Sequence, residues 1–328
     1  MYNVDPRPAQ QAAGYQRLFG RERLTVGVFF PIESFQGDTP TMQGQVELGR
    51  FAEQAGFDAL WFRDVPLRDP SFGDVGQVYD PFVYLGHIAA VTRVIALGTA
   101  AIVLPLRHPL HTAKAAASVD QLSQGRLVLG VASGDRPAEF PAFGVDIGDR
   151  AALFRENLLV LQRALGESFP VIESPYGRLH GVDLVPKATT REIPVLVAGR
   201  SGQDLDWIAR HAHGWLSYPR APSLQRQIVA EWRAAQQRVR GHVDLPFAQS
   251  LYIDLDARED HPEQPIHLGY RLGRRVLVQL LARLHAAGVQ HVILNLKYGS
   301  RPALEVMRDL ADVLPAVHAA TRPATALA

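Results

Sequence analysis

Hydrophobic and polar positions divide this chain into short apolar runs separated by amphipathic segments. The runs carry almost no charge, which is typical of strands buried on both faces. We expect eight such strands, at residues 24–30, 59–62, 94–104, 127–132, 195–198, 215–218, 247–255 and 291–296. Between them, apolar side chains recur at the spacing of helices, as at Leu205, Ile208, Ala209 and Ala212, and again at Met307, Leu310, Ala311 and Leu314.

Residues 97–134 form the clearest strand–helix–strand unit. An apolar run ends at Pro105, the turn Arg107-His108-Pro109 opens a helix, and Gly125 closes it before the next run. A helix also begins near Asp80-Pro81, a capping residue followed by proline at the first helical position. Two apolar strands joined by a helix are expected to be parallel neighbours in one sheet.

Eight strands that are each followed by a helix predict a (β/α)8 TIM barrel. We expect one domain over residues 1–328, with an N-terminal extension at 1–22 and a tail at 319–328. An insertion is expected between the fourth and fifth strands, with a helix at 150–165 and a strand-like pair around Pro175-Tyr176-Gly177. The alternative is an open doubly wound sheet, but no Gly-x-Gly-x-x-Gly turn follows the first strand.

Composition narrows the class of protein. With 328 residues and 47% apolar content the chain can bury a large core, and a net charge of +1 gives no reason to expect nucleic acid. The longest uncharged apolar stretch, 95–106, is shorter than the roughly 20 residues that span a bilayer. The polar N-terminus has no apolar signal segment, so we expect a cytoplasmic protein. The absence of cysteine excludes disulfides, thiolate zinc sites and a cysteine nucleophile.

In such a barrel, chemistry is expected on the loops that follow strands. The polar ones are Pro31-Ile32-Glu33, Arg63-Asp64, Arg107-His108, Ser133-Gly134-Asp135-Arg136, Gly199-Arg200-Ser201-Gly202, Tyr218-Pro219-Arg220 and Asn295-Leu296-Lys297. The turn from Gly199 to Gln203 offers amides, a hydroxyl and a guanidinium at a helix start, which suits a phosphate. It could equally be a tight turn with a serine cap. Ser133–Arg136 is a second anion candidate, or a surface turn with an Asp–Arg pair.

The sequence gives little support for a catalytic histidine, a metal site or a serine-hydrolase site. His108 could cap its helix or touch a ligand, and His211 and His213, just before a strand, are expected to pack or to lie on the surface. No His and carboxylate trio has metal-ligand spacing, so no metal site is expected, and no Gly-x-Ser-x-Gly elbow is present.

Several longer motifs resemble one known family. They are LTVGVFFPIE, AEQAGFDALWFRD, LGTAAIVLP, DQLSQGRLVLGVASGDRPAEFPAFGVD, FRENL, HGVDLVPK, IPVLVAG and HAHGWL. Together they cover almost the whole chain. It is similar to the bacterial luciferase-like flavin-dependent oxidoreductase superfamily, in the luciferase-type oxidoreductase branch rather than true luciferase.

The resemblance implies a barrel that holds FMN, or a deazaflavin coenzyme, at its C-terminal mouth. The implied residues on the ring side are Phe30, Pro31, Arg63, Asp64, Ala100 and Ala101, with a non-prolyl cis peptide between the last two. Those on the phosphate side are Ser133, Gly134, Gly199, Arg200, Ser201, Gly202 and Gln203. The small residues Ala100 and Ala101 would also let a flat ring approach the backbone.

The chain also departs from luciferases. Arg63-Asp64-Val65 replaces their Glu-His-His run, so their histidine general acid/base is absent, and Ala132-Ser133 replaces their Cys-Arg. Asp64 and Arg63 are then the candidates for proton transfer and charge stabilisation, and a salt bridge that holds the loop is the alternative.

We therefore expect a flavin-dependent oxidoreductase, an FMN-dependent monooxygenase that acts on a small organic substrate with reduced flavin and O2. The alternatives are a deazaflavin-dependent dehydrogenase or reductase and a non-catalytic flavin-binding protein. Expected partners are the substrate, a flavin reductase and a second copy of the chain in a homo-oligomer, with a dimer favoured. The charged, proline-containing segment from Asp254 to Gly269 is expected to be a mobile or substrate-contacting loop.

Overall fold

Eight parallel strands close into a barrel in the computed structural model, which describes residues 9–241 and 243–322. The strands are, in order around the barrel, β1 (Thr25–Phe29), β2 (Ala59–Phe62), β3 (Ala96–Thr99), β5 (Leu127–Ala132), β8 (Val195–Ala198), β9 (Gly214–Ser217), β10 (Phe247–Leu255) and β13 (His291–Asn295). The ring closes because β13 pairs in parallel with both β10 and β1. The predicted (β/α)8 TIM barrel is confirmed.

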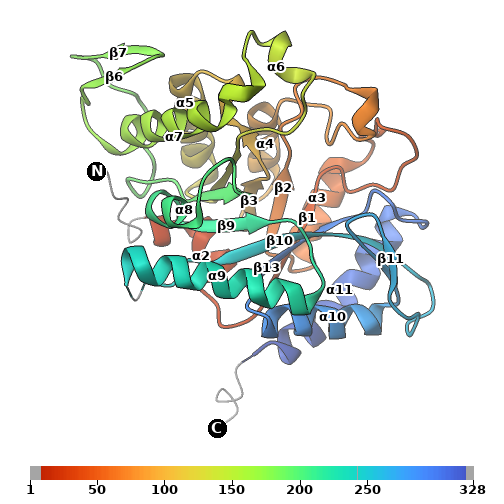
Figure 1. Ribbon diagram of the computed structural model, residues 1–328. Coiled ribbons are helices and arrows are strands. Elements are labelled where there is room, and N and C mark those ends of the chain that lie inside the picture. Colours follow the sequence, from red (N-terminus) through yellow and green to blue (C-terminus); the bar gives the residue numbers. More distant parts are fainter. Residues whose placement is uncertain (1–8, 242, 323–328) are drawn as a thin grey trace.

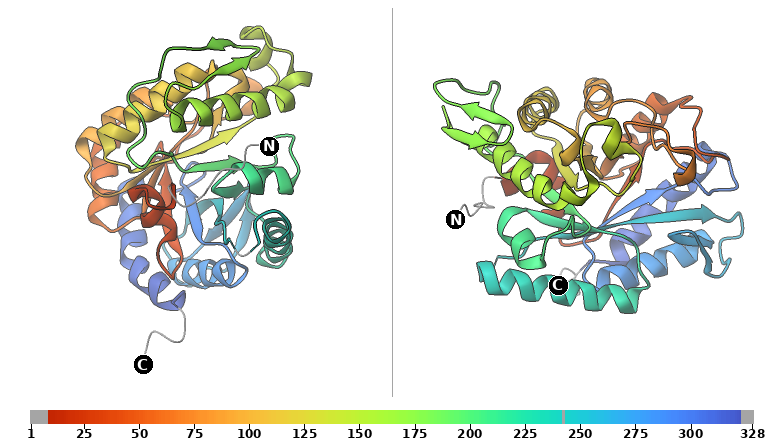
Figure 2. Two further views of the ribbon diagram at one scale, coloured as in Figure 1. Left: turned by 90° about the vertical axis from the view of Figure 1, so that its left-hand side faces the viewer. Right: turned by 45° about the horizontal axis from the view of Figure 1, so that its top comes forward.

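Helices surround this barrel (Figure 1, Figure 2). They are α3 (Gln45–Gln54), α4 (Pro81–Val91), α5 (Pro109–Ser123), α7 (Arg150–Gly166), α8 (Leu205–His211), α9 (Pro222–Arg240), α10 (Arg274–Ala286) and α11 (Ala303–Ala320). The predicted starts of α4 and α5 are confirmed: Asp80 accepts hydrogen bonds from two backbone N–H groups, and His108 accepts one. In the ranges that the structure describes, no helix has both the length and the apolar character to cross a membrane.

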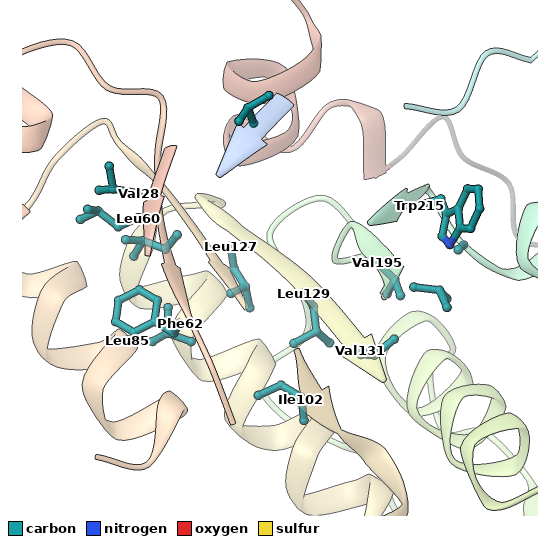
Figure 3. Close-up of a cluster of buried hydrophobic side chains, with 14 of the residues drawn as sticks. Val28, Leu60, Phe62, Leu85, Ile102, Leu127, Leu129, Val131, Val195 and Trp215 are labelled. Carbon is teal, nitrogen blue, oxygen red and sulfur yellow. The ribbon is translucent and has the colours of Figure 1, made fainter. Parts of the chain in front are cut away.

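Side chains along each barrel strand alternate between two apolar layers. One layer lies between strands and helices and includes Val28, Leu60, Phe62, Leu127 and Leu129 (Figure 3). The other fills the barrel and includes Phe29, Ala59, Trp61, Val128, Leu196, Ala248 and Ile293. This alternation decides which side chains can reach the mouth of the barrel.

Part of the predicted N-terminal extension closes the bottom of the barrel. Helix α2 (Ala13–Phe19) places Leu18 in the inner apolar layer, and Thr25 Oγ1 donates a hydrogen bond to the Leu18 carbonyl at 2.8 Å. Residues 1–8 of the extension and 323–328 of the predicted tail lie outside the described residues. The start of the predicted tail belongs to α11. Because Leu18 packs in the inner apolar layer, residues 13–19 contribute to the core of the barrel.

The predicted strand at 94–104 is interrupted. It forms β3 and the two-residue strand β4 (Ile102–Val103), which pairs with β5. Between them lie Ala100 and Ala101, and the peptide bond joining these two residues is cis, as the resemblance implied. The chain therefore leaves and rejoins the barrel wall at this point.

Two insertions extend the barrel. The predicted one, between β5 and β8, contains α6 (Glu139–Ala142), α7 and a hairpin of β6 (Ile172–Ser174) and β7 (Gly177–Leu179), which confirms the strand pair. The second follows β10, where three residues of the segment predicted as a loop form β11 (Gln264–Ile266), which pairs with β12 (Gly269–Leu272). Pro265 is tolerated because β11 is an edge strand, where a backbone N–H is not needed.

Candidate functional site

A cavity of about 590 Å³ opens where the C-terminal ends of the barrel strands meet. Every barrel strand contributes a residue from its C-terminal half or just beyond its end, namely Phe29, Arg63, Ala100, Ala132, Ala198, Ser217, Tyr252 and Asn295. This volume is in the range of pockets that bind small molecules and cofactors.

Most of the predicted site residues meet in this cavity. Its lining includes Arg63, Asp64, Ala100, Ala101, Ser133, Gly134, Gly199, Arg200, Ser201 and Gly202. The predicted residues Phe30, Pro31 and Gln203 are not among those that line it. Residues from four separate loops are therefore brought together, although they are spread over positions 63 to 202 of the chain.

Phe30 faces away from the cavity. Its ring packs behind the barrel wall, 5.0 Å from Phe62 and 5.2 Å from Tyr84 between ring centroids, and Pro31 is buried directly after it. Because neighbouring residues of a strand point to opposite sides, it is Phe29 that lines the cavity. The apolar run from Val28 to Phe30 is buried on both sides, so the sequence contained no signal for this choice.

The floor of the cavity is made of small side chains. Ala100, Ala101, Ala132 and Ala198 line it at the ends of three neighbouring strands. A methyl group is the largest side chain at each of these positions, so a flat ring system can come close to the backbone. This arrangement fits the planar part of a flavin.

A glycine-rich turn forms one end of the cavity. Gly199, Ser201 and Gly202 have φ values of 57°, 48° and 72°, and a Cβ atom on Gly202 would lie 2.4 Å from the Ala151 Cβ. Ser201 Oγ donates to the Ala198 carbonyl and accepts from the Ser133 N–H at 3.1 Å. The two predicted anion loops therefore form one structure, whose successive backbone N–H groups suit an anion.

Two side chains at this turn form contacts that the sequence did not predict. Asp204 rather than Ser201 caps helix α8, since its carboxylate accepts from the Trp207 N–H at 2.6 Å. The Gln203 amide supports the turn from behind, where it donates to the Ala151 carbonyl and accepts from the Arg155 guanidinium. Several polar groups lie near each of these side chains in the folded protein. The local sequence therefore does not predict which of them each side chain binds.

Positive charge gathers at the same end. Arg150 and Arg200 both line the cavity, and the half-exposed Arg200 lies 3.5 Å from Glu231 on α9. Backbone N–H groups in a turn with positive φ and two guanidiniums make a site for a phosphate. The donor set thus fits the phosphate of a flavin mononucleotide.

Arg63 and Asp64 form ion pairs, but not with each other. Arg63 binds both oxygens of Asp74, at 2.8 and 3.2 Å, and this guanidinium holds the pKa of Asp74 below its ordinary value although burial acts to raise it. Asp64 accepts two hydrogen bonds from Arg107 and one from the Val103 N–H. This geometry favours the salt-bridge alternative for Asp64, with Arg107 as the partner, over proton transfer.

Several aromatic and polar residues of the cavity were not predicted as site residues. Phe72, Tyr252 and Tyr298 line it, and so do His267 and Leu268 from the tip of the β11–β12 hairpin. The last two belong to the segment that was expected to contact the substrate. The others have no signature in the sequence, because they depend on which loops fold over the mouth.

The remaining histidine predictions concern packing. His211 is buried, and burial lowers its pKa to about 4, while His213 accepts from the Val195 N–H within the sheet. Within residues 9–241 and 243–322, no group of three or more His, Asp or Glu side chains is arranged to hold a metal ion.

Comparison with known proteins identifies the family of this chain. The family model described as luciferase-like monooxygenase matches residues 24–312. The alkanal monooxygenase alpha chain of Photorhabdus luminescens is 29% identical over 174 residues, which are 53% of this chain and 47% of that protein. The chain thus matches about half the length of this relative.

Two solved structures share the fold. An F420-dependent secondary alcohol dehydrogenase, in complex with an F420-acetone adduct, superposes with a TM-score of 0.74 at 18% identity over 90% of this chain and 99% of that chain. The oxygenating constituent of 3,6-diketocamphane monooxygenase from Pseudomonas putida, in complex with FMN, gives a TM-score of 0.60 at 16% identity over 71% of this chain and 68% of that chain.

Proposed function

Because this chain belongs to the luciferase-like monooxygenase family, we propose that it is a flavin-dependent oxidoreductase, an FMN-dependent monooxygenase of a small organic substrate. One observation carries the proposal: the glycine-rich turn and the flat alanine floor are parts of the same cavity. A phosphate at the turn would direct a flavin ring over the floor, at the open end of the barrel.

Each group of residues around the cavity has its own role in the proposed reaction. The 199–202 turn, Arg150 and Arg200 would hold the phosphate, and the alanine floor would support the ring. Arg63, held in place by Asp74, directs a fixed positive charge at the cavity, where it can stabilise negative charge that develops during reaction. When bound in its reduced form, FMN would supply the two electrons with which one atom of O2 enters the substrate and the other leaves as water. The barrel wall excludes bulk water from that side of the ring.

Substitution of Arg200 by alanine tests the cofactor site. Loss of one charge-assisted contact to the phosphate is expected to weaken FMN binding by about ten-fold. Titration of flavin fluorescence with each protein gives the two dissociation constants. Arg210→Ala, on the adjacent helix α8 and outside the cavity lining, is the matched control and should bind FMN as the wild type does. Equal affinities for wild type and Arg200→Ala would place the phosphate elsewhere.

A deazaflavin coenzyme is the alternative occupant of the same cavity, with dehydrogenase or reductase chemistry and no need for O2. The phosphate turn and the alanine floor would serve either ring system. Absorbance spectra and the mass of the cofactor purified with the protein separate the two, because the flavin and deazaflavin chromophores absorb at different wavelengths.

We further propose that a separate reductase supplies the reduced flavin and that the protein is a homodimer. Light scattering after size-exclusion chromatography measures the oligomeric state. Addition of a flavin reductase and its nicotinamide substrate to the purified protein tests whether oxygen consumption then depends on a candidate substrate.

A further inference from the structure

The cavity has a second polar end, apart from the phosphate turn. Arg136 follows β5 and reaches across the mouth, where its Nη2 donates to the Asp74 carbonyl at 2.6 Å and its guanidinium lies 4.5 Å from the centroid of the Phe72 ring. The side chain lines the cavity, yet the residue is only 9% exposed. Arg136 is thus a buried cation at the edge of a pocket.

No carboxylate in the part of the chain that the structure describes lies within ion-pair distance of this cation. Arg136 forms no ion pair there, and its Nη1 has no hydrogen-bond partner. The nearby carboxyl of Glu139 is also buried and leaves its Oε1 without a partner, so the two side chains do not satisfy each other. A buried charge without a partner is costly, and a ligand with negative charge would remove that cost.

A wall of three rings lies on the same side of the mouth. The Tyr252 and Tyr298 ring centroids are 5.2 Å apart, and His267 lies 6.1 Å from the first and 5.6 Å from the second. Contacts at Asp74 connect the rings to Arg136: the Asp74 carbonyl accepts from Arg136 Nη2, and its carboxylate lies 3.9 Å from Lys297 Nζ, which is 5.7 Å from the Tyr298 ring centroid. The rings and the cation therefore border one space.

Strand pairing holds this wall in place. Strand β12 pairs in parallel with β10, and the Tyr252 N–H donates to the Leu268 carbonyl at 3.1 Å. His267 and Leu268 form the two-residue tip of the hairpin, with Leu268 at a φ of 52°. The tip is thus attached to the barrel sheet directly beside the cavity.

We propose that the substrate is a ring-bearing anion of the aromatic carboxylate class, whose acid group binds Arg136 and whose ring packs on Tyr252, His267 and Tyr298. This inference rests on the proposed function, which assigns the glycine-rich turn to the cofactor phosphate and leaves this end of the cavity for the substrate. A neutral linear substrate would leave Arg136 without a counter-ion and would gain little from the rings.

Calorimetric titration of the FMN-loaded protein tests the inference with three probes. Cinnamate carries both a ring and a carboxylate, cinnamyl alcohol has the ring alone, and octanoate has the carboxylate alone. Cinnamate is expected to bind about ten-fold more tightly than either of the others. Arg136→Met should reduce cinnamate affinity by about ten-fold, to that of the alcohol, and Arg136→Lys should retain part of the difference. Arg178→Met, the same change on the exposed strand β7, is the matched control and should leave the affinity unchanged.

A ring variant gives an independent readout. Tyr298→Leu is expected to weaken cinnamate and to leave octanoate unchanged, and it decides the matter if Arg136→Met does not fold. Equal cinnamate affinity in wild type and Arg136→Met, with FMN bound to both, would overturn this inference and leave the proposed function standing. A wild-type protein that binds no flavin would overturn both.

Discussion

Replacement of Asp64 by asparagine is expected to lower the free energy of unfolding by about 2 to 3 kcal/mol. The carboxylate is buried and accepts from Arg107 Nη2 at 2.7 Å, Arg107 Nε at 2.8 Å and the Val103 N–H at 3.0 Å. Asparagine has the same size and can still accept from Val103. It removes the charge, however, and leaves Arg107 with Asp80 as its remaining carboxylate.

Thermal unfolding measures this loss, which should lower Tm by roughly 3 to 4 °C. Asp206→Asn is the matched control, because Asp206 pairs with Arg238 at 2.6 Å on the surface, where such a pair contributes less than about 1 kcal/mol. If Asp64 were the proton-transfer group, the variant would keep its stability and lose one limb of its pH–rate profile. That outcome would contradict a positioning role for Asp64.

The barrel could be predicted because its determinants are local. Each strand is a short run of apolar residues, and helix starts such as Asp80-Pro81 and His108-Pro109 carry their own capping groups. Eight repeats of the unit then leave few topologies that bury every strand on both faces. The turn at Gly199–Gly202 was also recognisable, since positive φ values favour glycine.

The sequence did not predict which side of a barrel strand each side chain faces. Phe29 and Phe30 are equally apolar and both buried, and only the register of β1 against its neighbours places the first in the cavity. A strand with one polar face would have revealed its inner side in the sequence. A strand buried on both faces does not.

The sequence did not predict the ion-pair partners either. Arg63 and Asp64 are adjacent, yet Arg63 pairs with a residue 11 positions away and Asp64 with one 43 positions away. Consecutive residues at a strand end point to opposite sides, so neighbours of opposite charge rarely meet there. The state of Arg136, buried and without a carboxylate partner, likewise depends on how the loop after β5 folds over the mouth.

Glu139 is expected to make the protein less stable as the pH rises. Its side chain is buried at the start of α6, and burial raises the pKa of the carboxyl to about 7 from an ordinary value of 4.5, although Arg136 acts to lower it. Between these two values the folded protein keeps a proton that the unfolded chain has lost. Stability therefore falls as the pH increases through this window and is constant above it.

Glu139→Gln removes this dependence. The shift in pKa corresponds to about 3 kcal/mol, so the variant should be more stable than the wild type by up to that amount at about pH 8, with the difference vanishing below about pH 4.5. Chemical unfolding across this range measures it, and the exposed Glu173→Gln on β6 is the matched control. A variant that is less stable than the wild type at about pH 8 would mean that Glu139 is ionised and paired with Arg136. Arg136 would then have its counter-ion within the protein, and an anionic substrate would no longer be needed to supply one.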